Sequence, residues 1–288
     1  MTILNRPGRL SLKKLFGSSM RNLKRFVQFI SLICLLACCA PLGAAQQRAV
    51  PAGNDFRQDV PVAASTLFER AVRMAKAGKG ELAQTLLKES LKLYPDYFDA
   101  HLALGNELSK AGRLSEAMTE FELARKINPR DDQVYLSVGL VMMQQKRYDL
   151  AASVFADASL LNRTEPLHRL MRGIALVRQA STLKQPTSKS ALSERNSLYR
   201  KAEEALSEAY NLSSGRLAEV YLYRALIYEQ RGERELAATE LEQYLQQSQG
   251  AENAETVREA IRKLREPVTG AGTAHPPSQG SQQREQRR

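Results

Sequence analysis

Apolar and small residues recur along the middle of the chain at helical spacing and with a period of 34 residues. Within residues 102–129, four of these positions are Gly112, Ala117, Phe121 and Pro129. The residues 34 positions earlier are of a similar kind: Gly78, Ala83, Leu87 and Pro95. A repeat of this length with helical spacing predicts a series of helix–turn–helix units.

The residue types within one unit have physical reasons. Gly105 and Ala117 are small enough to let two helices approach closely, and Phe121 is large enough to fill the space beside them. Gly112 can adopt a positive φ and so end the first helix, while Pro129 cannot continue the second. We therefore expect each unit to be a closely packed pair of helices.

Extending the period along the chain gives the expected organisation. No segment alternates apolar and polar residues as strands do, so the predicted fold class is all-α. We expect five helix pairs, at about residues 64–97, 98–131, 132–165, 166–215 and 218–250, and a capping helix at 254–265. The fourth pair carries an insertion of 17 residues, because the period resumes late between Gly173 and Ala202. We expect the helices on both sides of the insertion to be extended and to project from the row.

The net charge of +11 is concentrated at the N-terminus. Residues 1–25 contain seven Lys and Arg and no acidic residue. In the repeats, basic and acidic residues are interleaved as on a solvated helix surface, so nucleic acid is not expected as a partner. Residues 46–63 read as a linker, and residues 267–288 are too poor in apolar residues to bury a core, so they are predicted to be a disordered tail.

The basic start precedes an uncharged apolar run. Its strongly apolar part, Val27 to Ala40, would span about 21 Å as a helix, which is less than the ~30 Å of a hydrocarbon core. A basic start, a short apolar core and small residues predict a secretory signal peptide or membrane-targeting segment over residues 1–45, with cleavage after Ala45. We therefore expect an exported protein of the periplasm or cell envelope that meets the membrane only through this segment.

Three fates of the N-terminal segment stay open. Leu35 to Cys38 resembles the lipobox of bacterial lipoproteins, in which the cysteine is acylated, and this makes Cys38 the candidate lipidation site. The other two fates are cleavage after Ala45 without a lipid and retention as an anchor. The start of translation is also open, because Met20 begins a signal of more ordinary length than Met1 does.

The repeats resemble the tetratricopeptide repeat family over about residues 64–265. The family pattern is a large residue, Leu-Gly, an aromatic residue, Ala, a bulky aromatic residue and Pro. The second repeat fits this pattern with His101, Leu104, Gly105, Leu108, Ala117, Phe121 and Pro129. The third departs from it at Arg163, which replaces the proline, and the first and fifth have Ala71 and Ala225 in place of the first glycine. The resemblance implies a right-handed superhelical solenoid of about five helix pairs plus a capping helix.

The sequence offers no set of residues from which to build a reactive centre. The three histidines, His101, His168 and His275, are scattered, and no Cys or His pair has metal-binding spacing. No glycine-rich phosphate loop precedes a helix. We therefore expect a protein that is not an enzyme and binds no cofactor or metal.

Binding of a protein partner is the expectation that remains. In tetratricopeptide proteins the first helices of the repeats line the concave face, and positions i, i+4 and i+7 of each helix share one side. These positions give the candidate groove residues Phe68, Val72, Leu102, Asn106, Leu136, Leu140, Met143, Leu170, Ile174, Val177, Leu222 and Leu226. This apolar stripe has two interpretations: it packs internally, or it forms a groove for an apolar or amphipathic segment of a partner.

The resemblance also implies what the groove does not bind. Chaperone-binding members of the family hold a C-terminal carboxylate with Lys, Asn and Arg on this face. Apolar residues stand at such places here, among them Phe68, Val72 and Leu136, which argues against a receptor for chaperone tails.

The expected function is a non-enzymatic protein-binding scaffold or adaptor in a bacterial cell envelope. Two alternatives stay open. One is an outer-membrane-attached lipoprotein that assists the assembly of an envelope or secretion machine. The other is a subunit that positions a cell-wall or secretion enzyme.

Overall fold

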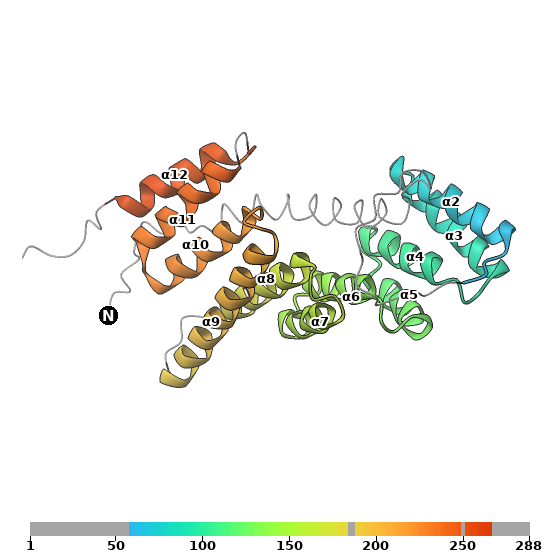
Figure 1. Ribbon diagram of the computed structural model, residues 1–288, viewed down its shortest axis with the longest axis horizontal. Helices are drawn as coiled ribbons and strands as arrows, with labels where there is room; N and C mark the ends of the chain where they lie inside the picture. Colours follow the sequence, from blue (N-terminus) through green and yellow to red (C-terminus); the bar gives the residue numbers. More distant parts are fainter. Residues whose placement is uncertain (1–57, 184–187, 249–250, 267–288) are drawn as a thin grey trace, which may run out of the picture.

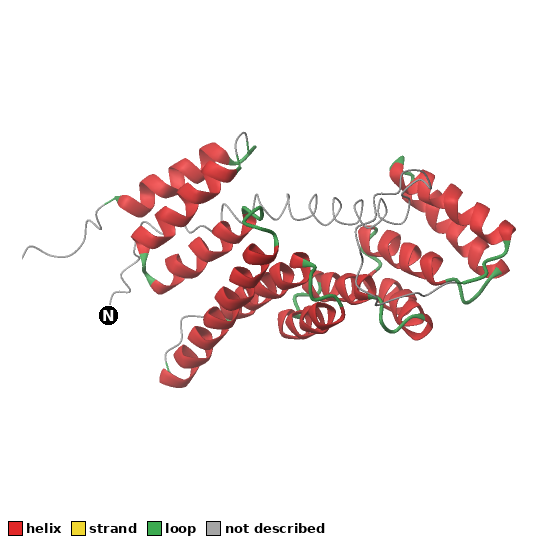
Figure 2. Cartoon of the chain, viewed as in Figure 1, coloured by secondary structure: helices red, strands yellow, loops and turns green. Residues whose placement is uncertain are grey.

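The structure is an arched row of helices (Figure 1). It is a computed structural model that describes residues 58–183, 188–248 and 251–266. Helices make up most of this part of the chain, short loops join them, and no strand occurs in it (Figure 2). The helices are α2 (Val62–Lys76), α3 (Gly80–Leu93), α4 (Phe98–Lys110), α5 (Leu114–Ile127), α6 (Asp132–Gln144), α7 (Tyr148–Leu161), α8 (Pro166–Thr182), α9 (Lys189–Leu212), α10 (Glu219–Arg231), α11 (Arg234–Gln247) and α12 (Ala254–Arg265). The prediction of an all-α solenoid of five helix pairs with a capping helix is confirmed.

The turn inside a helix pair requires a left-handed residue. Gly112 has a φ of 78°, as predicted, and Gly78 and Gly232 have the same role in the first and fifth pairs. The third pair has Lys146 at this place, with a φ of 62°. A side chain in this conformation costs roughly 1–2 kcal/mol, so the surrounding packing must hold the turn in place.

Close packing inside each pair depends on small residues. A Cβ atom on Gly105 would lie 2.5 Å from Cε1 of Phe121, so only glycine lets the aromatic ring sit against the helix. Phe121 and Ala117 are both fully buried. The predicted roles of these three residues are therefore confirmed.

The row is continuous because each second helix also packs against the first helix of the next pair, as α3 does on α4 and α7 on α8. The buried residues form two core clusters, one over the first three repeats and one from the third repeat to the capping helix. The two helices that flank the insertion have 17 and 24 residues, and α9 projects beyond its neighbours (Figure 1). At the far end, α12 packs on α11.

Several predictions from the sequence lie outside the described residues. They are the signal peptide, cleavage after Ala45, lipidation of Cys38 and the tail after residue 266. Within the described part, no helix combines the length and the apolar character that crossing a bilayer requires.

Candidate partner-binding face

The first helices of the repeats lie side by side. α2 contacts α4, α4 contacts α6, and α8 contacts α10. Figure 1 shows α4, α6, α8 and α10 along the inner side of the arch, with α5, α7 and α9 on its outer side. The inner side is therefore the candidate partner-binding face.

Most of the predicted groove residues do not lie on the surface of this face. Leu136, Leu170, Ile174 and Val177 are at most 1% exposed and belong to the core. The others that are buried are Phe68, Val72, Leu102, Leu140 and Leu226. These nine side chains do not form an open groove, and of the two interpretations of the stripe internal packing applies to them, because neighbouring helices pack closely enough for their side chains to cover one another.

Three predicted groove residues keep part of their surface exposed. They are Asn106 on α4, Met143 on α6 and Leu222 on α10. Ser137 donates a hydrogen bond to Asn106 over 3.2 Å, which links α6 to α4. The accessible part of the face is therefore a mixture of polar and apolar side chains.

A second row of exposed side chains was missed at the sequence level. In each first helix, the residue three positions before the first groove residue is half-buried, and these residues are Ser65, Asp99, Gln133, Leu167 and Glu219. Positions i and i+3 share one side of a helix, so the periodicity could have found this row. We call these five residues, together with Asn106, Met143 and Leu222, the inner face.

Negative charge gathers where α4 and α6 begin. Burial raises the pKa of Asp99. Burial, Asp132 and Asp99 raise the pKa of Asp131 to about 6, although the backbone N–H groups of Gln133 and Val134 donate to its carboxylate and oppose the shift. These carboxylates are crowded, so a positively charged group of a partner would relieve their repulsion.

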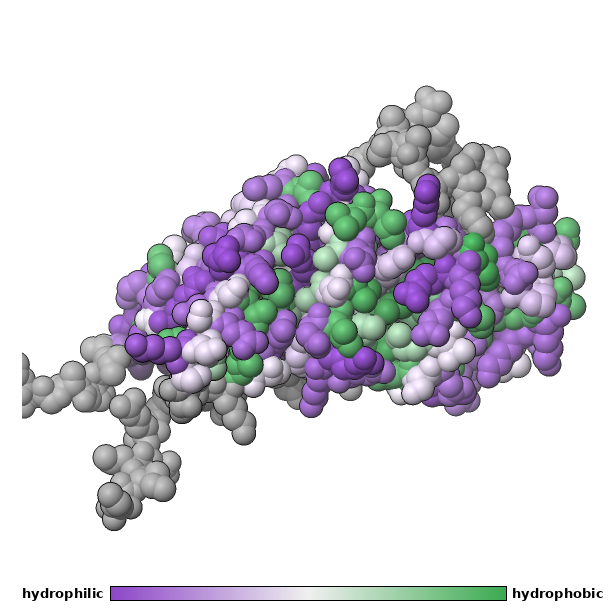
Figure 3. Space-filling model, turned by 90° about the horizontal axis from the view of Figure 1, so that it is seen from below, coloured by the Kyte–Doolittle hydropathy of each residue, from purple (hydrophilic) through white to green (hydrophobic). Residues whose placement is uncertain are grey.

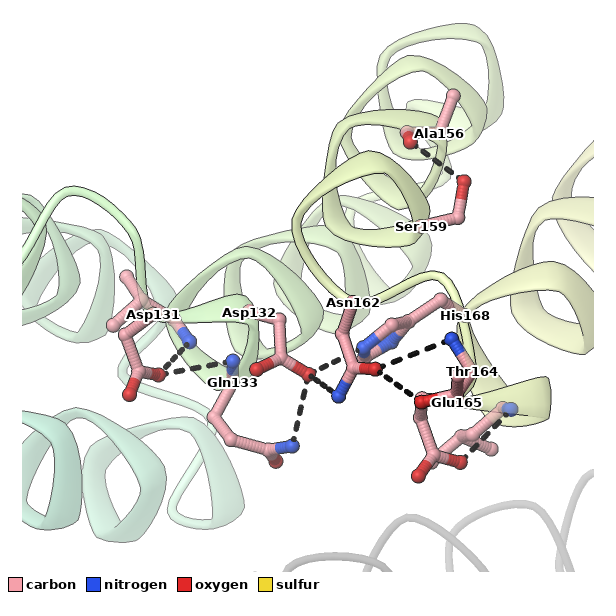
Figure 4. A network of polar contacts seen from close by, with 11 residues as sticks. Asp131, Asp132, Gln133, Ala156, Ser159, Asn162, Thr164, Glu165 and His168 are labelled. Atoms are coloured by element: carbon pink, nitrogen blue, oxygen red, sulfur yellow. Dashed lines mark hydrogen bonds and ion pairs between the residues drawn. The ribbon is translucent and has the colours of Figure 1, made fainter. Parts of the chain in front are cut away.

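A buried polar network fixes the fourth repeat to the third (Figure 4). His168 on α8 is fully buried, and its Nε2 donates to Oδ2 of Asp132 on α6 over 2.6 Å. Asn162, in the loop before α8, donates to the same oxygen over 3.2 Å. Burial raises the pKa of Asp132, but the hydrogen bonds from His168 and Asn162 outweigh burial and lower it. The network orients the two helices and leaves little of this carboxylate for a ligand.

His101 has a comparable structural role in the second repeat. Its Nδ1 lies 2.7 Å from Oε2 of Glu120, and its Nε2 lies 2.8 Å from the carbonyl oxygen of Pro95. Burial lowers its pKa, but these two oxygen partners outweigh burial, so the pKa of His101 is raised. Both ring nitrogens are thus occupied in joining α4 to its neighbours. Within the described residues, no three His, Cys, Asp or Glu gather as a metal site would require.

The outer face also carries exposed apolar side chains, but they do not recur at one position of every repeat. Viewed from below, the molecule shows hydrophobic residues in patches among hydrophilic ones (Figure 3). The exposed leucines of α5 and α7 are Leu123, Leu150, Leu160 and Leu161. Exposed leucines are common on soluble proteins. The inner face differs because one position recurs in all five repeats.

Comparison with known proteins identifies the repeats. The sequence profile of the tetratricopeptide repeat family matches residues 74–140, which span the end of α2, the whole of α3, α4 and α5, and most of α6. These residues of the chain belong to the tetratricopeptide repeat family. Over 93 residues, or 32% of its length, this repeat protein is 26% identical to an uncharacterized protein of Haemophilus influenzae. The chain spans about half the length of that relative, 52%.

Solved structures share the architecture. A structure of MamA from Desulfovibrio magneticus RS-1 is 18% identical, with a TM-score of 0.55 over 67% of this chain and 99% of that one. YrrB, described as a repeat protein with an unusual peptide-binding site, is 17% identical, with a TM-score of 0.51 over 68% of this chain and 92% of that one. At these identities the similarity concerns the fold of this repeat protein.

Proposed function

We propose that this protein is a non-enzymatic scaffold that binds a segment of a protein partner on the inner face. The observation that carries the proposal is the recurrence of one half-exposed position in all five first helices. Packed helices lie about 8–10 Å apart, and an extended chain advances about 3.3 Å per residue. An extended segment crossing the helices would therefore place roughly every third side chain over a new repeat.

The chemistry of the inner face favours an amphipathic segment over a purely apolar one. Met143 and Leu222 offer apolar contacts, whereas Asn106 and Gln133 offer hydrogen bonds. Asp99 adds negative charge, so a basic residue in the partner segment would be favoured there. The peptide-binding site of YrrB supports the proposal, since that protein has the same kind of solenoid.

The test replaces apolar surface on the inner face without adding charge. Met143→Gln and Leu222→Gln should reduce capture of a partner from an envelope extract by about tenfold or more, because each loses roughly 1–2 kcal/mol of apolar contact. Leu236→Gln is the matched control, because Leu236 lies on the second helix α11 and is 50% exposed. Thermal melts should be similar for all three variants. Equal capture by all variants would rule out the inner face.

The location in the envelope is part of the same proposal and depends on the N-terminal segment. The modification state of Cys38 distinguishes the two versions of this proposal, a lipoprotein and a periplasmic adaptor. Fatty-acid labelling that is lost in Cys38→Ser would support a lipoprotein attached to a membrane. Absence of labelling together with an N-terminus after Ala45 would support a periplasmic adaptor.

A further inference from the structure

The insertion in the fourth repeat creates a second feature, which shares no residue with the inner face. The first half of α9 projects beside the turn between α10 and α11, and an open cleft of about 880 Å³ lies between them. The cleft is lined by Leu192, Ser193, Arg195, Asn196, Ser197, Arg200 and Glu203 of α9, and by Gln230, Arg231 and Glu233. Leu192 to Ser197 precede the position at which the second helix of an ordinary repeat begins, so a repeat without the insertion would lack this part of the wall.

One wall of the cleft is held in place by an ion pair. Arg231 on α10 donates two hydrogen bonds to the Glu203 carboxylate on α9, over 2.9 and 2.8 Å. Each of these side chains is about one quarter exposed. A bidentate pair of this kind fixes the geometry of both partners. The cleft is therefore a preformed feature of the fourth and fifth repeats.

The other two arginines of the cleft are available for a ligand. Arg195 is half-buried and has no ion pair within the described residues; its Nε is buried without a hydrogen-bond partner, so a ligand would meet the rest of the guanidinium group. Arg200 is paired over 3.2 Å with Glu204, one turn away on the same helix, and both side chains are more than half exposed. Such a surface pair contributes little, so another carboxylate can replace Glu204 at small cost.

The remaining lining defines the class of ligand. Ser193, Asn196 and Ser197 add hydrogen-bond donors, and the exposed side chain of Leu192 adds an apolar contact. Glu203 and Glu233 share the lining, so the cleft favours a segment with only a few carboxylates placed at the arginines over a uniformly anionic polymer such as nucleic acid, which would bring phosphates against both glutamates. A peptide that combines carboxylates with an apolar residue matches both the charges and the leucine.

We propose that this cleft is a second binding site, which takes an acidic segment of a partner protein through Arg195, Arg200 and the apolar side of Leu192. This site is independent of the inner face. It binds an acidic segment, whereas the inner face favours a segment with a basic residue. A partner with one basic and one acidic segment could therefore engage both.

The test measures fluorescence anisotropy of a short labelled peptide of glutamates and leucines bound to the full chain. We expect the double variant Arg195→Gln with Arg200→Gln to bind about tenfold more weakly, which corresponds to about one charge-assisted hydrogen bond. Arg195→Lys with Arg200→Lys keeps both charges and should retain part of the affinity. The matched control is Arg125→Gln with Arg258→Gln, which removes two exposed arginines from α5 and α12.

Binding of the peptide in the cleft differs measurably from binding by charge alone. Equal weakening in the control would mean general charge attraction, and unchanged binding in the cleft variant would mean that the peptide binds elsewhere; either result overturns the proposal. Displacement by inorganic phosphate as effective as that by unlabelled peptide would assign the cleft to phosphate instead. Met143→Gln with Leu222→Gln should bind the acidic peptide normally, so failure of the inner-face proposal would leave this one standing.

Discussion

At the scale of single residues, each helix pair depends on a matched choice of two side chains. Gly139 faces Phe155, and the second repeat has the same combination. The first and fifth repeats instead have alanine with a leucine at the facing position: Ala71 with Leu87 and Ala225 with Leu241. An alanine on the first helix thus goes with a leucine on the second, whereas glycine occurs with phenylalanine and, in the fourth repeat, with Leu206 opposite Gly173.

This pairing predicts the effect of Gly139→Ala. The new Cβ would lie 2.4 Å from Cε1 of Phe155, a ring that is fully buried and has no room to move. Alanine gains up to about 1 kcal/mol of helix propensity. The clash outweighs it, so we expect the free energy of unfolding in urea to fall by about 1–3 kcal/mol.

The matched partner provides the control for this prediction. Adding Phe155→Leu to Gly139→Ala recreates the combination of the first repeat. The double variant should therefore be less destabilised than the sum of the two single variants. Strictly additive losses would contradict competition for the same space.

At the scale of the elements, the start of α6 carries a charge that the fold does not favour. Asp131 caps this helix by accepting N–H groups of Gln133 and Val134, over 3.0 and 3.2 Å. Burial and the neighbouring carboxylates nevertheless raise its pKa to about 6. The folded protein thus binds this proton more tightly than the unfolded chain. The stabilisation that comes from this bound proton is complete below pH 3.8, the ordinary pKa of an aspartate. It is lost as the pH rises through about 6, the pKa of Asp131 in the folded protein.

Asp131→Asn should therefore stabilise the protein in a pH-dependent way. Asparagine caps a helix as well as aspartate does, but it carries no charge. We expect its melting temperature to exceed that of the parent above pH 7 and the difference to disappear near pH 4. Asp157→Asn removes an exposed carboxylate from α7 and serves as the control. A gain that is equal at both pH values would contradict the assigned cause.

At the scale of the whole molecule, stability passes from one helix to the next along the row. α12 closes the row by burying Val257 and Leu264 against α11. Arg234 donates to the carbonyl oxygens of Lys263 and Leu264 over 2.5 and 2.8 Å, and so caps the end of α12. Solenoids need such a terminal cap because every inner repeat is covered by its neighbours.

Removal of α12 should consequently weaken the last repeats. Truncation after Ser248 exposes apolar surface of α11 around Leu241 and Tyr244, which are buried in the intact chain. We expect a lower midpoint of thermal unfolding and more aggregation on heating. Truncation after Glu266 keeps α12 and is the matched control. Identical melts for the two truncated chains would show that α12 does not act as a cap.

The sequence by itself determined the helices, their pairing and the break in the period. Local chemistry suffices for this: Gly112 ends a helix through its φ, Phe121 needs a glycine opposite, and the late return of the period at Ala202 marks the insertion. These features depend on residues within one unit of about 34 positions. They can therefore be read from spacing alone.

Only the tertiary structure decided which side chains remain accessible. Leu170 and Asn106 occupy equivalent sides of their helices in the sequence pattern, yet the first is buried and the second is partly exposed. Residues from different repeats also meet in the contact between His168 and Asp132 and in the cleft beside α9. Helical periodicity fixes the direction of a side chain on its own helix, whereas burial depends on how closely the neighbouring helices pack, which is a property of the assembled row.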